Sequence, residues 1–353
     1  MGSWIIVHGE DGEVIDYKPY ADGAILIFEA LENEQPNKFT VTDFFVNEFL
    51  GVVWHRLESY TEVTEGAILD FSCSSEEPVS NTVIGEFSLT VNNVPNGVSL
   101  KEFVASNGQN GGYAYSTGTP NGATFTFTSS LKIFEAQTDY LISVRDGDGG
   151  FKYYVLDNYV NGGSYIIDYS LFSAFDNLIA VDYPLHAKLR LSLTGYDESE
   201  NSYYYLSNLT SSGDFGGSFQ LGTYENFDQY RILYNISPYT NYEYEYSDFG
   251  ALPSTLIIPD QPSFTITNES VFEFEFSTNL EDYLEKTSEW VFQDGNYTTS
   301  WRIGSVKDYS PKLGGFPPNL IEMYPNLNLQ ALEHNNIEFR LNEKERITIY
   351  SAD

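Results

Sequence analysis

The chain has 353 residues, of which 51 are Asp or Glu and 17 are Lys or Arg, so its formal net charge is −34 at pH 7. So acidic a surface repels phosphate backbones and anionic lipid, which argues against nucleic acids and membrane surfaces as partners. Hydrophobic residues make up 41% of the chain, which excludes a wholly disordered protein. No apolar run approaches the roughly 18 residues of a transmembrane helix, and the single cysteine, Cys73, excludes an internal disulfide.

Strict alternation of apolar and polar residues recurs along the chain and predicts an all-β fold. The expected strands include residues 4–7, 25–27, 39–41, 52–54, 87–91, 124–128, 189–193, 272–276, 290–292, 299–303, 337–341 and 347–349. Asn- and Gly-rich clusters between several of them predict turns. Helical periodicity is nearly absent, and residues 280–286 and 327–332 are the fair candidates for short helices.

One segment of the chain recurs 102 residues further on. Residues 138–146 align without a gap on 240–248, and at the same offset the strand 87–91 falls on 189–193. Residues 154–156 likewise fall on 256–258. Three strands in one register predict two tandem copies of one β domain.

The detail of the repeat carries a resemblance to a known family. The second copy contains Ile236-x-Pro238-x-Thr240-x-Tyr242, and the first contains Phe134-x-Ala136-x-Thr138-x-Tyr140. This pattern resembles the fibronectin type III signature between strands E and F, over about residues 65–160 and 165–262. The resemblance implies Ig-like sandwiches in which the tyrosine hydroxyl bonds to backbone a few residues upstream. Both copies lack the tryptophan that the family usually carries after strand B, and the first has alanine in place of the proline.

We therefore expect four domains. These are an N-terminal β domain at 1–62, sandwiches at 63–162 and 163–262, and a β-rich C-terminal domain at 263–353. The composition and the modular β plan resemble surface lipoproteins and secreted proteins of the Bacteroidota, which implies a location outside the cytoplasm, at the cell surface or secreted. The opening Met1-Gly2-Ser3 is typical of an expression remnant. We accordingly expect that a native leader has been removed.

Motifs of known catalytic chemistry are missing, and no catalytic residue is assigned. The four histidines, His8, His55, His186 and His334, are isolated, with none at metal-ligand spacing. Cys73 ends an alternating segment and is expected to be a core or near-surface residue rather than a nucleophile. Any two of the 51 acidic residues could serve a glycosidase as acid and nucleophile, but no pair stands out.

One loop has a composition suited to binding a cation. Asp146-Gly-Asp148-Gly-Gly150 places two carboxylates two residues apart in a Gly-rich turn, and calcium favours oxygen-rich loops. The loop lacks the third acid and distal glutamate of a helix-loop-helix calcium site. A plain hairpin between two strands is the favoured interpretation, and a calcium ion held by Asp146 and Asp148 is the alternative.

Aromatic residues are the remaining candidates for binding. Tyr242, Tyr244 and Tyr246 alternate and are expected in the core. Three consecutive rings at 203–205 must place at least one outward on a strand, which makes Tyr203, Tyr204 and Tyr205 candidate ligand contacts. Trp290 and Trp301 are further candidates. For each of these rings core packing is the more common alternative.

These observations predict a non-enzymatic binding protein in which the sandwiches act as spacers. The expected ligand is a polysaccharide, held by stacking on exposed aromatic rings. A protein-interaction or adhesion module that binds a cell-surface protein is the alternative, and a glycoside hydrolase with paired carboxylates is the third. No cofactor is expected apart from the possible calcium.

Overall fold

The computed structural model describes residues 2–21, 23–29, 38–71, 81–109, 111–116, 118–135, 138–183, 187–199, 201–212, 217–253, 256–307, 309 and 312–351. Cys73, His186 and Ala136 lie outside the described residues. Strands dominate what is described, so the all-β class is confirmed. No helix in the described part of the chain is long and apolar enough to cross a membrane. The chain divides into two compact units: unit 1 holds residues 1–75 and 260–353, and unit 2 holds residues 76–259.

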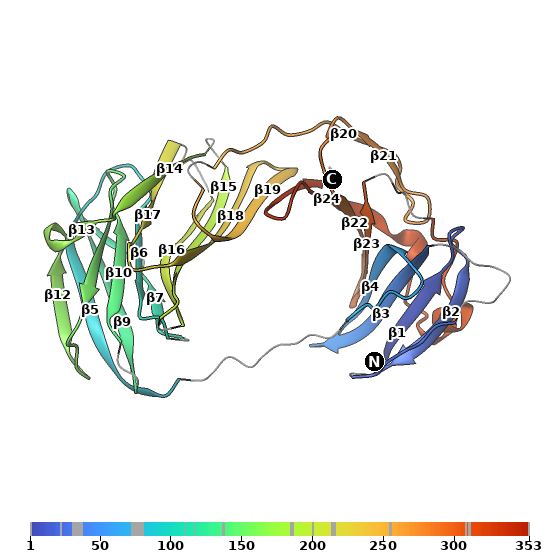
Figure 1. Ribbon diagram of the computed structural model, residues 1–353, viewed down its shortest axis with the longest axis horizontal. Coiled ribbons are helices and arrows are strands. Elements are labelled where there is room, and N and C mark those ends of the chain that lie inside the picture. The colour runs from blue at the N-terminus through green and yellow to red at the C-terminus, as the bar shows by residue number, and fades with distance from the viewer. Residues whose placement is uncertain are drawn as a thin grey trace. The chain divides into compact units, whose positions relative to one another are not determined.

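Eight strands of unit 1 lie side by side in the order β25-β24-β22-β23-β4-β3-β1-β2 (Figure 1). All neighbours are antiparallel except β23 and β4, which run parallel. This pairing joins the beginning of the chain to its end in one sheet. The strands are β1 (Gly2–His8), β2 (Val14–Tyr20), β3 (Phe39–Phe49), β4 (Val52–Val63), β22 (Glu285–Asp294), β23 (Tyr297–Val306), β24 (Glu333–Arg340) and β25 (Glu345–Tyr350).

The larger core cluster of unit 1 lies against one face of this sheet. Trp290 and Trp301 are its largest side chains, and they are 1% and 0% exposed. The other layer comes from α1 (Pro318–Met323), the 3-10 turn η2 (Leu329–Ala331) and the segment before α1, which supply Leu320, Leu329 and Phe316. A small antiparallel pair, β20 (Phe264–Asn268) and β21 (Glu275–Thr278), completes the described elements of the unit.

Three local expectations for unit 1 were wrong. Residues 25–27 were expected as a strand and lie in no strand or helix. Residues 280–284 are not helical and β22 begins at Glu285, because β22 hydrogen-bonds on both sides, to β23 and β24, and that pairing overrides a weak helical pattern. The α-helix instead lies at Pro318–Met323. Pro318 occupies its first position, where the missing N–H has no helical partner to lose. The alternating segment 272–276 is a strand only from Glu275.

The first half of unit 2 is a two-layer sandwich. One sheet has the order β13-β11-β10-β6-β7 and the other β12-β5-β9-β8. Their facing side chains form one cluster that includes Phe87, Val91, Phe127 and Ile142. The strands are β5 (Val83–Pro95), β6 (Glu102–Ser106), β7 (Tyr113–Tyr115), β8 (Thr119–Asn121), β9 (Thr124–Phe134), β10 (Tyr140–Arg145), β11 (Phe151–Leu156), β12 (Ser164–Asp168) and β13 (Ser173–Ala174), with the 3-10 turn η1 (Tyr169–Leu171) after β12.

The second half of unit 2 packs on the outer face of that sandwich. Strands β16, β15, β18 and β19 lie side by side in this order, and β14 pairs with β17. Every residue of β6 and β10 is buried, because one face looks into the sandwich core and the other packs on β16. The strands are β14 (Asn177–Tyr183), β15 (Lys188–Asp197), β16 (Ser202–Ser212), β17 (Gly217–Thr223), β18 (Gln229–Tyr239) and β19 (Tyr242–Gly250).

The two halves carry two of the three expected repeated strands, but pair them differently. Residues 256–258, which were expected to repeat the strand at 154–156, form no strand, and Leu256 makes only an isolated bridge to Val181. In the first half β5 and β10 lie in opposite sheets, whereas in the second β15 and β19 share one sheet with β18 between them. The Tyr140 hydroxyl donates to the Lys132 carbonyl, eight residues upstream, at 2.7 Å. The Tyr242 hydroxyl donates downstream, to the Pro259 carbonyl at 2.9 Å. The division into four domains stays a prediction.

Candidate functional site

Strand β16 separates the three consecutive tyrosines by face. Tyr203 is 45% exposed and Tyr205 is half-buried on the same outward face, while Tyr204 points inward and packs on Phe227 at 5.4 Å between ring centroids. This follows from the two-residue period of a strand. The sequence therefore predicted an outward ring correctly, and the structure shows that Tyr204 is not one.

Strand β7 places two further tyrosines beside Tyr205. Tyr113 and Tyr115 share a face, are 44% and 39% exposed, and have ring centroids 5.6 Å apart. The Tyr205 centroid lies 4.7 Å from that of Tyr113 and 6.5 Å from that of Tyr115. Three rings from two strands, far apart in sequence, thus form one exposed cluster.

The neighbouring strands extend this cluster along the same outward face. Tyr196 on β15 lies directly opposite Tyr203, with ring centroids 4.7 Å apart. Phe249 on β19, 49% exposed, lies 5.9 Å from Tyr196. We call the six rings the aromatic surface: Tyr113, Tyr115, Tyr196, Tyr203, Tyr205 and Phe249.

Polar groups border the aromatic surface. Arg231 on β18 is exposed and lies opposite Phe249 in the β18–β19 register. The Tyr196 hydroxyl donates to the Asn201 side-chain oxygen at 3.0 Å. Burial, with the nearby Tyr205, raises the pKa of Tyr115, so its phenol stays protonated and can donate a hydrogen bond. The surface combines apolar ring faces with donors and acceptors.

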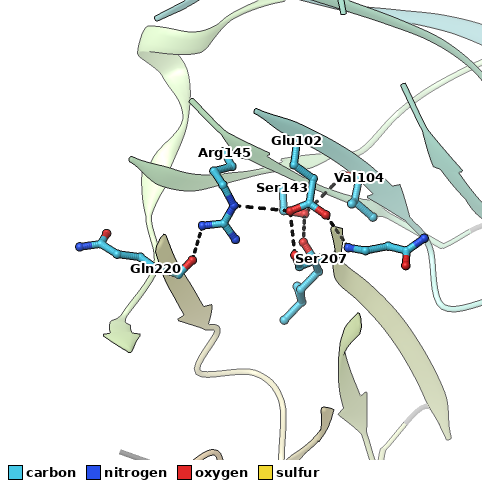
Figure 2. Close-up of polar contacts among 8 residues, drawn as sticks. Glu102, Val104, Ser143, Arg145, Ser207 and Gln220 are labelled. Atoms are coloured by element: carbon cyan, nitrogen blue, oxygen red, sulfur yellow. Dashed lines mark hydrogen bonds and ion pairs between the residues drawn. The ribbon is translucent and has the colours of Figure 1, made fainter. Parts of the chain in front are cut away.

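A buried polar cluster beneath this surface holds β16 against the first sandwich (Figure 2). Glu102 on β6 accepts hydrogen bonds from the Ser207 hydroxyl at 2.7 Å and from the Asn208 backbone N–H. The Arg145 Nε atom lies 3.6 Å from a Glu102 carboxylate oxygen, and both side chains are almost fully buried. Ser143 donates to the carbonyl of Leu206 at 2.5 Å.

The charges of this cluster have opposing effects on Glu102. Burial raises the pKa of the Glu102 carboxyl, while Arg145 and the hydrogen bonds from Ser207 and Asn208 act in the opposite direction. The Arg145 guanidinium also donates to the Gln220 carbonyl and lies 4.3 Å from the Phe151 ring centroid. A buried carboxylate fully hydrogen-bonded in this way fixes its neighbours, here the strand that carries Tyr203 and Tyr205.

The tryptophans proposed from sequence lie elsewhere. Trp290 donates to the Glu269 carbonyl and Trp301 to the Ser59 hydroxyl, each at 2.8 Å, inside the core of unit 1. Neither ring exposes a face on which a ligand could stack. They take no part in the aromatic surface.

The acidic turn joins β10 to β11 as a hairpin. One Asp146 oxygen accepts from the backbone N–H groups of Asp148 and Gly150, and the other accepts from the Tyr169 hydroxyl at 2.8 Å. Asp148 is exposed. No group of three His, Cys, Asp or Glu side chains that could hold a metal ion occurs among the described residues. The calcium site stays a prediction.

Sequence reasoning missed four of the six rings. Tyr113 and Tyr115 alternate, which is a signal for a shared face, but their segment is short and lies between Gly-rich turns. Tyr196 and Phe249 sit near strand ends, where alternation alone does not tell which face is covered. Only strand pairing shows that these rings meet Tyr203 and Tyr205.

Comparison with known proteins adds no information on the family or function of the chain. A scan against protein-family models and searches of the curated proteins and of the solved structures found no match to the chain.

Proposed function

We propose that the protein is a non-enzymatic glycan-binding protein that acts outside the cytoplasm, and that the aromatic surface of unit 2 receives the sugar chain. The observation that carries this proposal is the pair of exposed ring contacts, Tyr113 with Tyr205 and Tyr196 with Tyr203. Tyrosine offers a rigid apolar face together with a hydroxyl, at a low cost in side-chain entropy. Sugars present a matching combination of C–H faces and hydroxyls.

The arrangement of the rings favours an oligosaccharide over a single sugar. Tyr203 and Tyr205 are two residues apart on one strand face, which separates their attachment points by about 7 Å. Tyr113 and Phe249 extend the surface beyond them on either side. Arg231 supplies hydrogen-bond donors for hydroxyl groups along the same face.

Affinity gel electrophoresis of the purified chain against a panel of polysaccharides tests the proposal. We expect retardation by one glycan class, and at least about fivefold weaker binding for Tyr203→Ala and for Tyr113→Ala, since an aromatic contact contributes about 1 kcal/mol beyond its area. Tyr239→Ala is the matched control, because Tyr239 is an exposed tyrosine of the same unit outside the aromatic surface. Equal effects of all three substitutions, or retardation by no glycan, would contradict the proposal.

The same gels with and without a chelator test the calcium prediction. Loss of binding that Asp148→Asn reproduces would assign the ion to the 146–150 turn. Unchanged binding would leave that turn a plain hairpin.

A protein partner is the second candidate, and the position of β7 favours it. β7 is the last strand of its sheet, so among the described residues one side of its backbone has no strand partner in that sheet, and β7 carries Tyr113 and Tyr115. Co-purification of one cell-surface protein, lost in Tyr113→Ala, together with no glycan binding would establish this alternative.

A further inference from the structure

Unit 1 contains a cavity of about 240 Å³ at one end of its sheet. It lies between the ends of β3, β4 and β23 and the turn that follows α1. The residues that line it are Val46, Asn47, Glu48, Val53, His55, Tyr297, Met323, Tyr324, Pro325 and Asn326.

The strand register explains how the cavity is built. Val46 lies opposite His55 across β3 and β4, and Tyr297 lies beside Val53 across β4 and β23. Residues two apart share a face of a strand, so Val53 and His55 look to the same side of the sheet. His55 is 3% exposed and forms the floor, while Tyr324 comes from the turn beyond α1.

Three of the residues that line the cavity carry rings: His55, Tyr297 and Tyr324. The Tyr297 ring lies 6.5 Å from the His55 ring and within 10° of parallel to it. The Tyr324 ring lies 6.1 Å from His55 at 66°. The π faces of the two tyrosine rings are electron-rich and attract a cation placed over them.

The polar groups of the cavity point to the same kind of ligand. Glu48 stands exposed at the rim, with Asn47 and Asn326, and no Lys or Arg occurs among the described residues that line the cavity. His55 Nδ1 lies 3.4 Å from the Thr299 hydroxyl, and the other ring nitrogen has no hydrogen-bond partner among the described residues. Burial lowers the pKa of His55, so the imidazole is uncharged at neutral pH and does not repel a cation.

We infer that this cavity binds a small organic cation, an ammonium group, alkylated or not, which lies against Tyr297 and Tyr324 and close to the Glu48 carboxylate. The net charge of −34 concentrates cations at the surface and supports the same choice. The volume is below the roughly 300–1,000 Å³ of pockets for drug-sized ligands, so the site takes a compact head group. This inference concerns unit 1 and does not depend on the aromatic surface of unit 2.

Isothermal titration calorimetry with choline and with 3,3-dimethyl-1-butanol tests the inference. The two probes have the same shape, but the alcohol carries carbon in place of the charged nitrogen. We expect choline to bind at least about tenfold more tightly, as cation–π contacts in partly desolvated sites provide. Equal affinities, or binding of glucose and of neither probe, would overturn the assignment.

Substitutions of residues that line the cavity test whether choline binds there. Glu48→Gln keeps the shape of an exposed side chain and is expected to weaken choline binding about fivefold, whereas Glu333→Gln, an exposed glutamate of β24 that does not line the cavity, leaves it unchanged. Tyr297→Leu is expected to abolish the preference for choline over the alcohol. Glu48→Gln at wild-type affinity would refute the site even if Tyr297→Leu fails to fold. Tyr203→Ala should leave choline binding intact, which separates this test from that of the glycan proposal.

Discussion

The buried histidine of β24 predicts a specific loss of stability in weak acid. His334 is 7% exposed, stacks on Phe274 with ring centroids 4.7 Å apart, and meets the edge of Trp290. Its Nδ1 is 2.7 Å from the Ser351 hydroxyl, and Nε2 is buried with no partner among the described residues. Burial therefore lowers the pKa of His334 to about 4.

The direction of the effect follows from proton linkage. The unfolded chain takes up a proton on His334 below a pKa of about 6.5, whereas the folded chain does not until about 4. The stability of the folded state is thus complete above pH 6.5 and falls as the pH drops toward 4. The full loss is about 3 kcal/mol, and the slope is about 1.4 kcal/mol per pH unit for one proton. Burial lowers the pKa of His8 and His55 as well, so both add to the slope.

Urea unfolding at pH 7, 6 and 5, followed by tryptophan fluorescence, measures this loss. All four tryptophans and the three described histidines belong to unit 1, so the signal reports the unit that titrates. We expect His334→Phe to reduce the slope between pH 6 and 5 by about 1.4 kcal/mol per pH unit. Ile349→Val, a core substitution of similar cost without a titrating group, should keep the wild-type slope. A wild-type slope in His334→Phe would refute the reasoning.

Substitutions at three further residues probe unit 2, each by urea unfolding followed by near-ultraviolet circular dichroism of tyrosine. Glu102→Ala leaves Arg145 buried without its carboxylate partner and is expected to lower the free energy of unfolding by about 3–5 kcal/mol. The stability of Glu102→Gln should lie between those of the wild type and Glu102→Ala. A loss below about 1 kcal/mol for Glu102→Ala would contradict the role of this pair. Tyr169→Phe removes the donor to buried Asp146 and should cost about 1–3 kcal/mol, and an unchanged midpoint would show that the bond does not stabilise the turn. Tyr140→Phe removes one hydroxyl bond to backbone and should cost about 1 kcal/mol; an unchanged free energy of unfolding would argue against a stabilising tyrosine corner.

Two of the six rings of the aromatic surface could be predicted from the sequence. Three adjacent tyrosines on an alternating strand require at least one outward ring, and Tyr203 and Tyr205 are outward. The inward position of Tyr204 depends on which face of β16 is covered. Tyr113 joins the surface only because β6, its partner strand, packs on β16. No local pattern contains that information.

For Tyr242, Tyr244 and Tyr246, by contrast, alternation in the sequence was enough to predict the position of the rings. All three were expected in the core, and all three are buried. Trp290 and Trp301 could not be assigned in this way, since a single large ring on a strand fits either face. Their burial follows from the layer that α1 and its neighbours place over the sheet.

The sequence by itself determined the all-β class and the position of most strands, because the two-residue period of a strand is a local property of the chain. Only the tertiary structure decided which strands are neighbours. β4 pairs with β23 across more than two hundred residues, and β19 shares a sheet with β15 although their counterparts in the first half, β10 and β5, lie in opposite sheets. Strand propensity does not specify a partner. The buried surfaces and hydrogen bonds between distant segments do, and they also gather the six rings of the aromatic surface and the cavity at His55.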